Sequence, residues 1–142
     1  MSGPYRGSCL CGAVRFEVDA FLADAAHCHC RMCRKFHGAS FATFATAKRD
    51  AFRWLQGEDR LKRYTADNGT TRTFCGDCGS SLSFHSPRAN QDEIEITMGT
   101  LDDDVPLEPS AHIFVGSAAS WTRLTDSLPK HDTERSSPEV KR

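Results

Sequence analysis

The sequence predicts a mainly β fold, and three observations support this. Short segments alternate apolar and polar residues with the period of two that is typical of strands. No stretch sustains the 3.6-residue period of an amphipathic helix. Seven cysteines lie in three close groups, which are suited to anchoring a small fold on metal ions. A chain of 142 residues has the length of one domain and can bury a sizeable core.

The alternation of apolar residues gives the expected strands in chain order. The first is carried by Val14, Phe16 and Val18. The next, at 41–46, is apolar on both faces and is therefore expected to be central. Turn signals rich in glycine, asparagine and proline separate further strands, which we expect at 61–65, 71–74, 82–85, 94–98 and 113–115. The one expected helical turn covers 31–36, so helical content should be small.

The chain divides into a predicted domain at 1–129 and a predicted flexible tail at 130–142. The tail is charged and polar, and Val140 is its only aliphatic residue. Such a segment cannot bury enough apolar surface to offset the entropy of ordering it. We therefore expect the chemistry to lie within the domain.

Charge and hydropathy exclude several classes of partner. The chain carries 18 Lys and Arg against 19 Asp and Glu, a formal net charge of −1. No basic excess is available for phosphate binding, so nucleic acid is not an expected partner. No apolar stretch approaches the roughly 18 residues of a membrane span, and the N-terminus lacks the apolar centre of a secretory signal. We expect a soluble, cytoplasmic protein that does not bind membranes; its oligomeric state is left open.

The cysteines are the most informative residues. Their number is odd, so disulfides within the chain would leave one thiol over, and a reducing compartment is expected. All of them fall in tight groups: Cys9 with Cys11; Cys28 with Cys30 and Cys33; Cys75 with Cys78. Thiolates one or two residues apart can meet one ion at the Zn–S distance of about 2.3 Å, so the spacing predicts chelation.

Seven thiols divide naturally into a closed site of four and an open site of three, in one of two ways. Two C-x-x-C arms (Cys30, Cys33, Cys75 and Cys78) could form the closed site and leave Cys9, Cys11 and Cys28. Alternatively, Cys9, Cys11, Cys75 and Cys78 form the closed site and leave Cys28, Cys30 and Cys33 as the open one. Local chemistry favours the second division. Glycines follow Cys11 and Cys78 directly, as tight metal-binding turns require, whereas cationic side chains flank the triplet and could bind an anion.

Three motifs resemble the glutathione-dependent formaldehyde-activating enzyme family, also called the centromere protein V family. They are GSCLCGAVRF at 7–16, CHCRMCRKFHG at 28–38 and RTFCGDCGSSL at 72–82. The similarity covers roughly residues 5 to 130 and continues through 99–102, 112–115, Trp121 and 126–129. The resemblance implies a tent-like single domain of antiparallel sheets anchored by zinc. It also implies two zinc ions: a structural ion on Cys9, Cys11, Cys75 and Cys78, and a second ion on Cys28, Cys30 and Cys33.

The resemblance also implies an activity for the three-cysteine site. A zinc ion with three thiolate ligands keeps a position open for a thiol or an aldehyde. The expected function is a carbon–sulfur lyase-like one, which acts on or carries a thiol–aldehyde adduct such as S-hydroxymethylglutathione. Cys28, Cys30 and Cys33 would hold the catalytic zinc, and His37 would relay a proton. Arg31 and Arg34 would bind the carboxylates of glutathione, the expected co-substrate.

Two other functions fit the cysteines. One is a non-catalytic zinc module that binds a thiol ligand or a protein partner. The other is an iron–sulfur protein, because cysteine geometry alone does not exclude iron. An iron–sulfur protein would be coloured, which separates it from a zinc protein.

Overall fold

The mainly β fold is confirmed by the computed structural model, which describes residues 3–22 and 24–142. The described residues form ten strands, one α-helix and four short 3-10 helices. The strands are β1 Tyr5–Ser8, β2 Arg15–Val18, β3 Ala26–Cys28, β4 Ala42–Lys48, β5 Phe52–Gln56, β6 Leu61–Thr65, β7 Thr71–Cys75, β8 Ser81–His85, β9 Glu93–Thr97 and β10 His112–Ile113. The helices are α1 Arg31–His37, η1 Arg49–Ala51, η2 Glu58–Arg60, η3 Met98–Thr100 and η4 Val115–Ser117.

The chain folds into two compact units, each assembled from two segments. The first unit contains residues 1–23 and 45–107, and the second contains residues 24–44 and 108–142. Strand β4 begins in the second unit and ends in the first. The predicted domain boundary at residue 129 stays a prediction.

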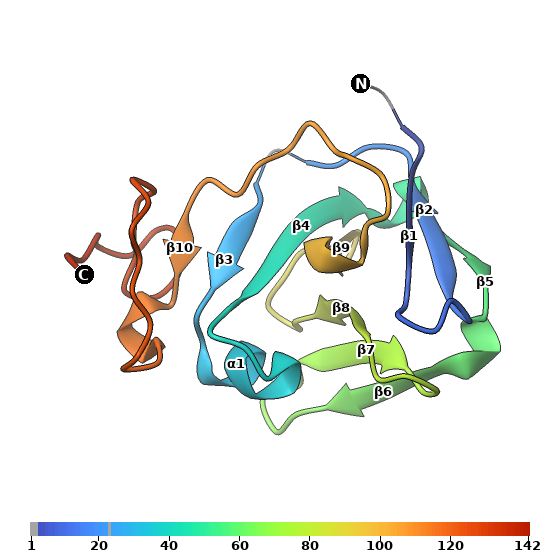
Figure 1. Cartoon of the computed structure of the whole chain (residues 1–142), viewed down its shortest axis with the longest axis horizontal. Helices are drawn as coiled ribbons and strands as arrows, with labels where there is room; N and C mark the ends of the chain where they lie inside the picture. The colour runs from blue at the N-terminus through green and yellow to red at the C-terminus, as the bar shows by residue number, and fades with distance from the viewer. Residues whose placement is uncertain (1–2, 23) are drawn as a thin grey trace. The chain divides into compact units, whose positions relative to one another are not determined.

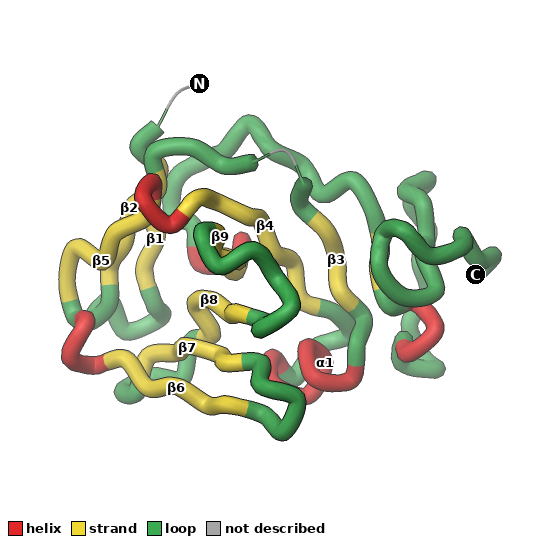
Figure 2. Tube along the Cα trace, turned by 180° about the vertical axis from the view of Figure 1, so that it is seen from behind, coloured by secondary structure: helices red, strands yellow, loops and turns green. Residues whose placement is uncertain are grey.

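The first unit holds two sets of antiparallel strands. Strand β2 lies between β1 and β5, and β8 lies between β7 and β9, with β6 outside β7 (Figure 1). Seen from behind, β6, β7 and β8 again run side by side (Figure 2). Both sets contribute to one core: Cys9, Val14, Phe16, Val18, Ala47, Cys75, Leu82, Ile94 and Ile96. Alternation explains this core, since every second residue of β2 and β9 points into it.

The second unit is built around β3, the strand that ends at Cys28. Strand β3 pairs antiparallel with the first part of β4 and parallel with β10. This parallel pair is an exception in a mostly antiparallel fold, because β10 returns from a distant part of the chain and does not close a hairpin. Helix α1 follows β3 after two residues and ends at His37, and its C-cap Gly38 adopts the left-handed conformation at φ 61°.

Residues 130–142 also belong to the second unit, and the segment runs beside β10 (Figure 1). The backbone N–H of Val115 donates to the carbonyl of His131 at 3.0 Å, and the N–H of Phe114 donates to that of Thr133 at 2.8 Å. The predicted flexibility of this tail in solution stays a prediction.

Most predicted elements have a counterpart in the structure. Strand β6 has the predicted bounds, and α1 extends the predicted helical turn by one residue. The strand expected at 113–115 stops at Ile113, because Phe114 adopts a left-handed φ of 57° and η4 begins at Val115. Strands β1, β3 and β5 were not predicted. Across residues 3–22 and 24–142, no helix has the length and apolarity needed to span a bilayer.

Candidate metal centres

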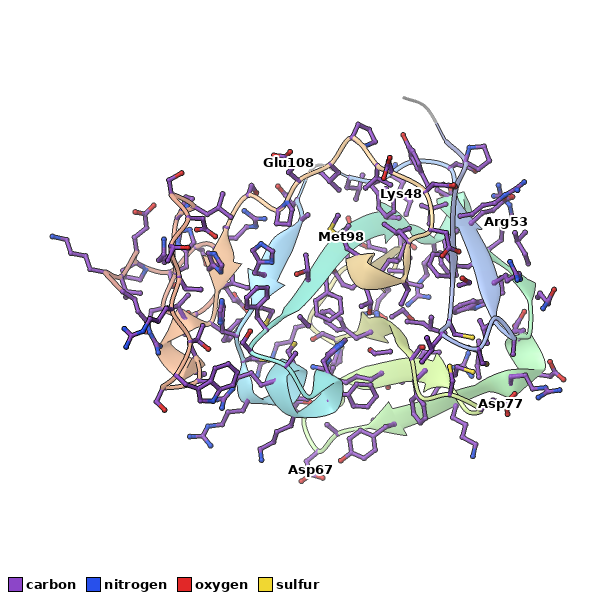
Figure 3. The ribbon with its side chains drawn as sticks, viewed as in Figure 1. Lys48, Arg53, Asp67, Asp77, Met98 and Glu108 are labelled. Atoms are coloured by element: carbon purple, nitrogen blue, oxygen red, sulfur yellow. The ribbon has the colours of Figure 1, made fainter. Side chains whose placement is uncertain are left out.

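Four cysteine sulfurs of the first unit converge on one point. Cys9 and Cys11 come from the loop after β1, and Cys75 and Cys78 come from the end of β7 and the loop after it. The four Sγ atoms lie within 4.8 Å of one another, with 3.6 Å between Cys9 and Cys11 and 3.9 Å between Cys11 and Cys75. In Figure 3, yellow sulfur sticks gather beside the labelled Asp77. The structure therefore groups Cys9 and Cys11 with Cys75 and Cys78, which is the division that local chemistry favoured in the sequence.

Short-range hydrogen bonds hold the two loops of the four-cysteine cluster. The N–H of Gly79 donates to the carbonyl of Cys75 at 2.8 Å, and Gly79 has a φ of 82°. A left-handed turn of this kind favours glycine, as the sequence analysis expected. The N–H of Leu10 donates to Ser80 Oγ at 2.8 Å and so ties one loop to the other. The N–H of Val14 donates to Cys9 Sγ at 3.2 Å and favours the thiolate there.

The four thiols of this cluster lie so close together that they cannot all lose their protons unless a cation is bound. A hydrogen bond from Ser80 Oγ is the main reason that the pKa of Cys78 falls to about 6. At Cys11, the N–H of Ala13 favours the thiolate, but Cys9 and the other neighbouring thiols oppose it, and the pKa rises to about 12. Four thiolates at such distances need a bound cation to be stable together.

Three cysteine sulfurs converge in the second unit, within one short stretch of chain. Cys28 ends β3, Cys30 caps the N-terminus of α1, and Cys33 lies in the first turn of that helix. The three Sγ atoms lie within 4.8 Å of one another, and the N–H of Cys33 donates to Cys30 Sγ at 3.3 Å. Cys28 and Cys33 are buried. Cys30 and Cys33 raise the pKa of the Cys28 thiol well above its usual range.

Both clusters can hold a metal ion. In a tetrahedral site with metal–sulfur bonds of about 2.3 Å, the sulfurs lie about 3.8 Å apart, close to the separations found here. All seven cysteines are present as thiols and not as disulfides. Thiolate ligands are soft donors, which suit zinc and iron better than magnesium or calcium. The four-cysteine cluster fills a tetrahedron, whereas the three-cysteine cluster leaves one corner for another ligand.

The other predicted site residues lie on α1, beside the three cysteines. Arg31 is exposed at the start of the helix. Arg34 donates from Nη1 to the carbonyl of Ser117 at 2.8 Å, so this guanidinium has a structural partner in the second unit. His37 ends the helix, and its ring contacts that of Phe44 edge-on at 5.6 Å. Whether these three residues bind a ligand or move a proton stays a prediction.

Sequence reasoning did not find a line of hydrogen-bonded side chains in the second unit. His29 Nε2 lies 2.9 Å from His112 Nδ1, and His112 Nε2 lies 2.8 Å from Asp126 Oδ2. Burial lowers the pKa of His29 to about 4. The bond from His112 lowers the pKa of Asp126 below its usual value. The family resemblance of segments 112–115 and 126–129 is the one sequence signal that points to these residues.

A comparison of the sequence with known families assigns the chain to one of them. The profile that describes the glutathione-dependent formaldehyde-activating enzyme matches residues 4–117. The chain belongs to this family. Both cysteine clusters lie inside the matched range, so the family match spans all seven thiols.

Individual relatives agree with the family assignment. The chain is 29% identical over 126 residues to a Halomonas elongata protein named as a candidate glutathione-dependent formaldehyde-activating enzyme, covering 83% of this chain and 79% of the relative. It is 26% identical over 80 residues to an uncharacterised lyase of Schizosaccharomyces pombe. That alignment spans 56% of this chain and only 56% of the yeast protein's length.

A solved structure supports the fold. The crystal structure of a Rhodobacter sphaeroides protein is similar with a TM-score of 0.60 and 31% sequence identity. The match covers 71% of this chain and 91% of the Rhodobacter protein. The fold of this family member is thus shared with a protein solved by experiment.

Proposed function

We propose that this family member is a zinc-dependent carbon–sulfur lyase-like protein that acts on or carries a thiol–aldehyde adduct such as S-hydroxymethylglutathione. The observation that carries the proposal is the unequal division of the thiols into four and three. A site of three thiolates leaves room for the thiol of a ligand, which a closed site of four does not. The family match and the relative named as a lyase support the same reaction class.

The reaction joins or separates two molecules without an external oxidant or reductant. In the forward direction, the glutathione sulfur adds to the carbonyl carbon of formaldehyde, and the thiol proton ends on the new hydroxyl oxygen. In reverse, the carbon–sulfur bond breaks and the hydroxyl proton returns to sulfur. Zinc would lower the pKa of a bound thiol and polarise the aldehyde oxygen.

We assign the chain's own residues as follows. Cys28, Cys30 and Cys33 would hold the zinc ion. Arg31 would pair with a carboxylate of glutathione, since it is exposed beside the cluster; Arg34 could do so only with the part of its guanidinium that does not bind Ser117. His37 would take up and return the proton, because an imidazole titrates near neutral pH. The reduced thiols suit the cytoplasm.

Metal analysis and calorimetry test the binding part of the proposal. The purified full chain should contain two zinc ions, and glutathione should bind it with one-to-one stoichiometry. S-methylglutathione is the matched control, since it keeps both carboxylates but has no free thiol, and it should bind far more weakly. Equal binding of the two compounds would show that the free thiol does not reach the zinc and would overturn the step in which zinc activates the glutathione thiol.

Exchange spectroscopy separates an enzyme from a carrier. At equilibrium, NMR follows the exchange of the methylene group between S-hydroxymethylglutathione and free formaldehyde hydrate. A lyase accelerates this exchange without changing the equilibrium concentrations. Wild-type protein should accelerate it, and Cys30→Ser should not. Binding without acceleration would leave the alternative, a non-catalytic zinc module that carries the thiol.

A further inference from the structure

Three side chains from distant parts of the sequence form a hydrogen-bonded line in the second unit. Asp126 Oδ2 lies 2.8 Å from His112 Nε2, and His112 Nδ1 lies 2.9 Å from His29 Nε2. His29 is 0% exposed and His112 is 1% exposed. His29 occupies the position between Cys28 and Cys30, so the line ends inside the backbone segment that carries two of the three thiols.

The hydrogen-bonding capacity of each group sets the tautomer of both rings. An ionised Asp126 carboxylate can only accept, so His112 must donate from Nε2. The Nδ1 of a neutral His112 then carries a lone pair, and His29 must donate to it from Nε2. His29 Nδ1 is left without a proton, and this buried atom has no hydrogen-bond partner among residues 3–22 and 24–142. A bare lone pair is the less costly state there, since an N–H without an acceptor would be a buried unsatisfied donor.

The rings of this line are held on several sides. The Phe41 ring lies 4.9 Å from that of His29, and the His27 ring lies 4.8 Å from that of His112. His27 is itself fixed through Nδ1, which lies 2.7 Å from Thr43 Oγ1. The backbone N–H of His29 donates to the carbonyl of Ile113 at 2.9 Å. The His29 residue is thus fixed at both its backbone and its ring.

We propose that Asp126, His112 and His29 form a positioning chain for the three-cysteine site. By fixing the ring of His29, they hold the Cys28–Cys30 segment so that its two sulfurs converge with Cys33. This role rests on the proposed function, since it presumes that the three cysteines hold zinc. Groups that orient metal ligands typically change metal affinity 10- to 100-fold when removed, so we expect about a tenfold loss.

Imidazole NMR tests the line without any measurement of activity. Long-range ¹H–¹⁵N correlations of the full zinc-loaded chain should show both His29 and His112 protonated on Nε2. In Asp126→Asn, the side-chain oxygen should remain with the N–H of Leu128, which Asp126 Oδ1 now accepts at 3.1 Å. The new amide N–H then faces His112 and should reverse the tautomers of both rings, which leaves His29 Nδ1–H without an acceptor among the described residues and therefore costs some stability. Unchanged tautomers in Asp126→Asn, or a wild-type His112 protonated on Nδ1 alone, would overturn the proposed line.

Metal competition tests the positioning role. With Co²⁺ as the probe and a chelator as competitor, Asp126→Ala should weaken one of the two sites about tenfold and shift its thiolate-to-cobalt absorption. Asp126→Asn keeps a hydrogen-bonded line and should retain most of the affinity. Asp24→Ala removes an exposed carboxylate of the same unit and is the matched control, which should match wild type.

The outcomes separate this inference from the proposed function. Two metal sites in wild type and unchanged affinity in Asp126→Ala would overturn the positioning role and leave the function standing. A single metal ion per wild-type chain would overturn both. Should Asp126→Ala fail to fold, equal loss of affinity in the folded Asp126→Asn and Asp126→Ser variants would still count against the line, because only the first retains a donor that reaches His112.

Discussion

The two cysteine clusters differ in how far apart their cysteines lie in the sequence. In the four-cysteine cluster, the sulfurs of Cys11 and Cys75 meet although 64 positions separate them. In the three-cysteine cluster, the thiols all lie between positions 28 and 33. An ion in the first cluster closes a long loop and therefore restricts the unfolded chain strongly, whereas an ion in the second closes only a short one. The first ion should stabilise the fold, and the second should be dispensable for it.

Substitution of single ligands should reveal this difference. We expect Cys78→Ser to lose one zinc ion and several kcal/mol of stability, of the order found for structural zinc sites. Cys30→Ser should also lose one zinc ion but keep the circular dichroism spectrum and most of the unfolding free energy. Elemental analysis and urea unfolding measure the two effects. Equal destabilisation by both substitutions would contradict the division into a structural and an open site.

The two arginines of the proposed ligand site should also differ in their effects on stability and on glutathione binding. Arg34 donates to the carbonyl of Ser117, and loss of a partly exposed bond of this kind costs about 1 kcal/mol. Arg31 is exposed, so Arg31→Ala should change stability by less than about 0.5 kcal/mol. Calorimetry should nevertheless show weaker glutathione binding in Arg31→Ala. A normal affinity in that variant would remove Arg31 from the ligand site.

At the level of elements, alternation predicted the strands that have one face in the core. In β9, Ile94 and Ile96 are buried and Glu95 between them is half-buried, which is the alternation that the sequence shows. Strand β5 was not predicted because its residues are all exposed or half-buried, so its sequence shows no buried apolar face. Strand β3 has only three residues, too few to show a period.

Strand β9 also carries a carboxyl group that opposes the fold at high pH. Glu95 lies opposite Phe84 of β8 and is half-buried. This burial raises its pKa above the usual value of about 4.5, although Thr46 Oγ1 donates to it at 2.9 Å. Below the unfolded pKa the acid is neutral in both states and stability is full. As the pH rises towards the folded pKa, the unfolded state loses its proton first and stability falls.

Glu95→Gln should remove this pH dependence, because the amide oxygen can still accept from Thr46 and carries no charge. Urea unfolding of variant and wild type should give similar free energies near pH 4. The variant should become the more stable of the two as the pH rises towards neutrality. Glu58→Gln, which removes an exposed carboxylate that does not act on Glu95, is the matched control. A constant difference between Glu95→Gln and wild type over this range would contradict a raised pKa at Glu95.

For the whole molecule, the sequence predicted the two clusters better than the surroundings of the second. Close spacing such as that of Cys75 and Cys78 is a local signal that one ion can explain. His29 and His112 are 83 positions apart, and their contact depends on the parallel pairing of β10 with β3. A two-residue strand such as β10 leaves no periodic signal. The thiols could therefore be predicted from spacing, whereas the imidazole line could not.

Because each cluster lies within a different compact unit, metal removal should affect the two units separately. A mild chelator should first remove the ion of the open three-cysteine site. Hydrogen exchange should then increase at the N–H of Arg34, which donates to the carbonyl of Cys30 at 3.0 Å. The N–H of Gly79, bonded to Cys75, should stay protected until a stronger chelator removes the second ion. Cys30→Ser should show the first change without chelator, and simultaneous loss of both protections in wild type would contradict two independent sites.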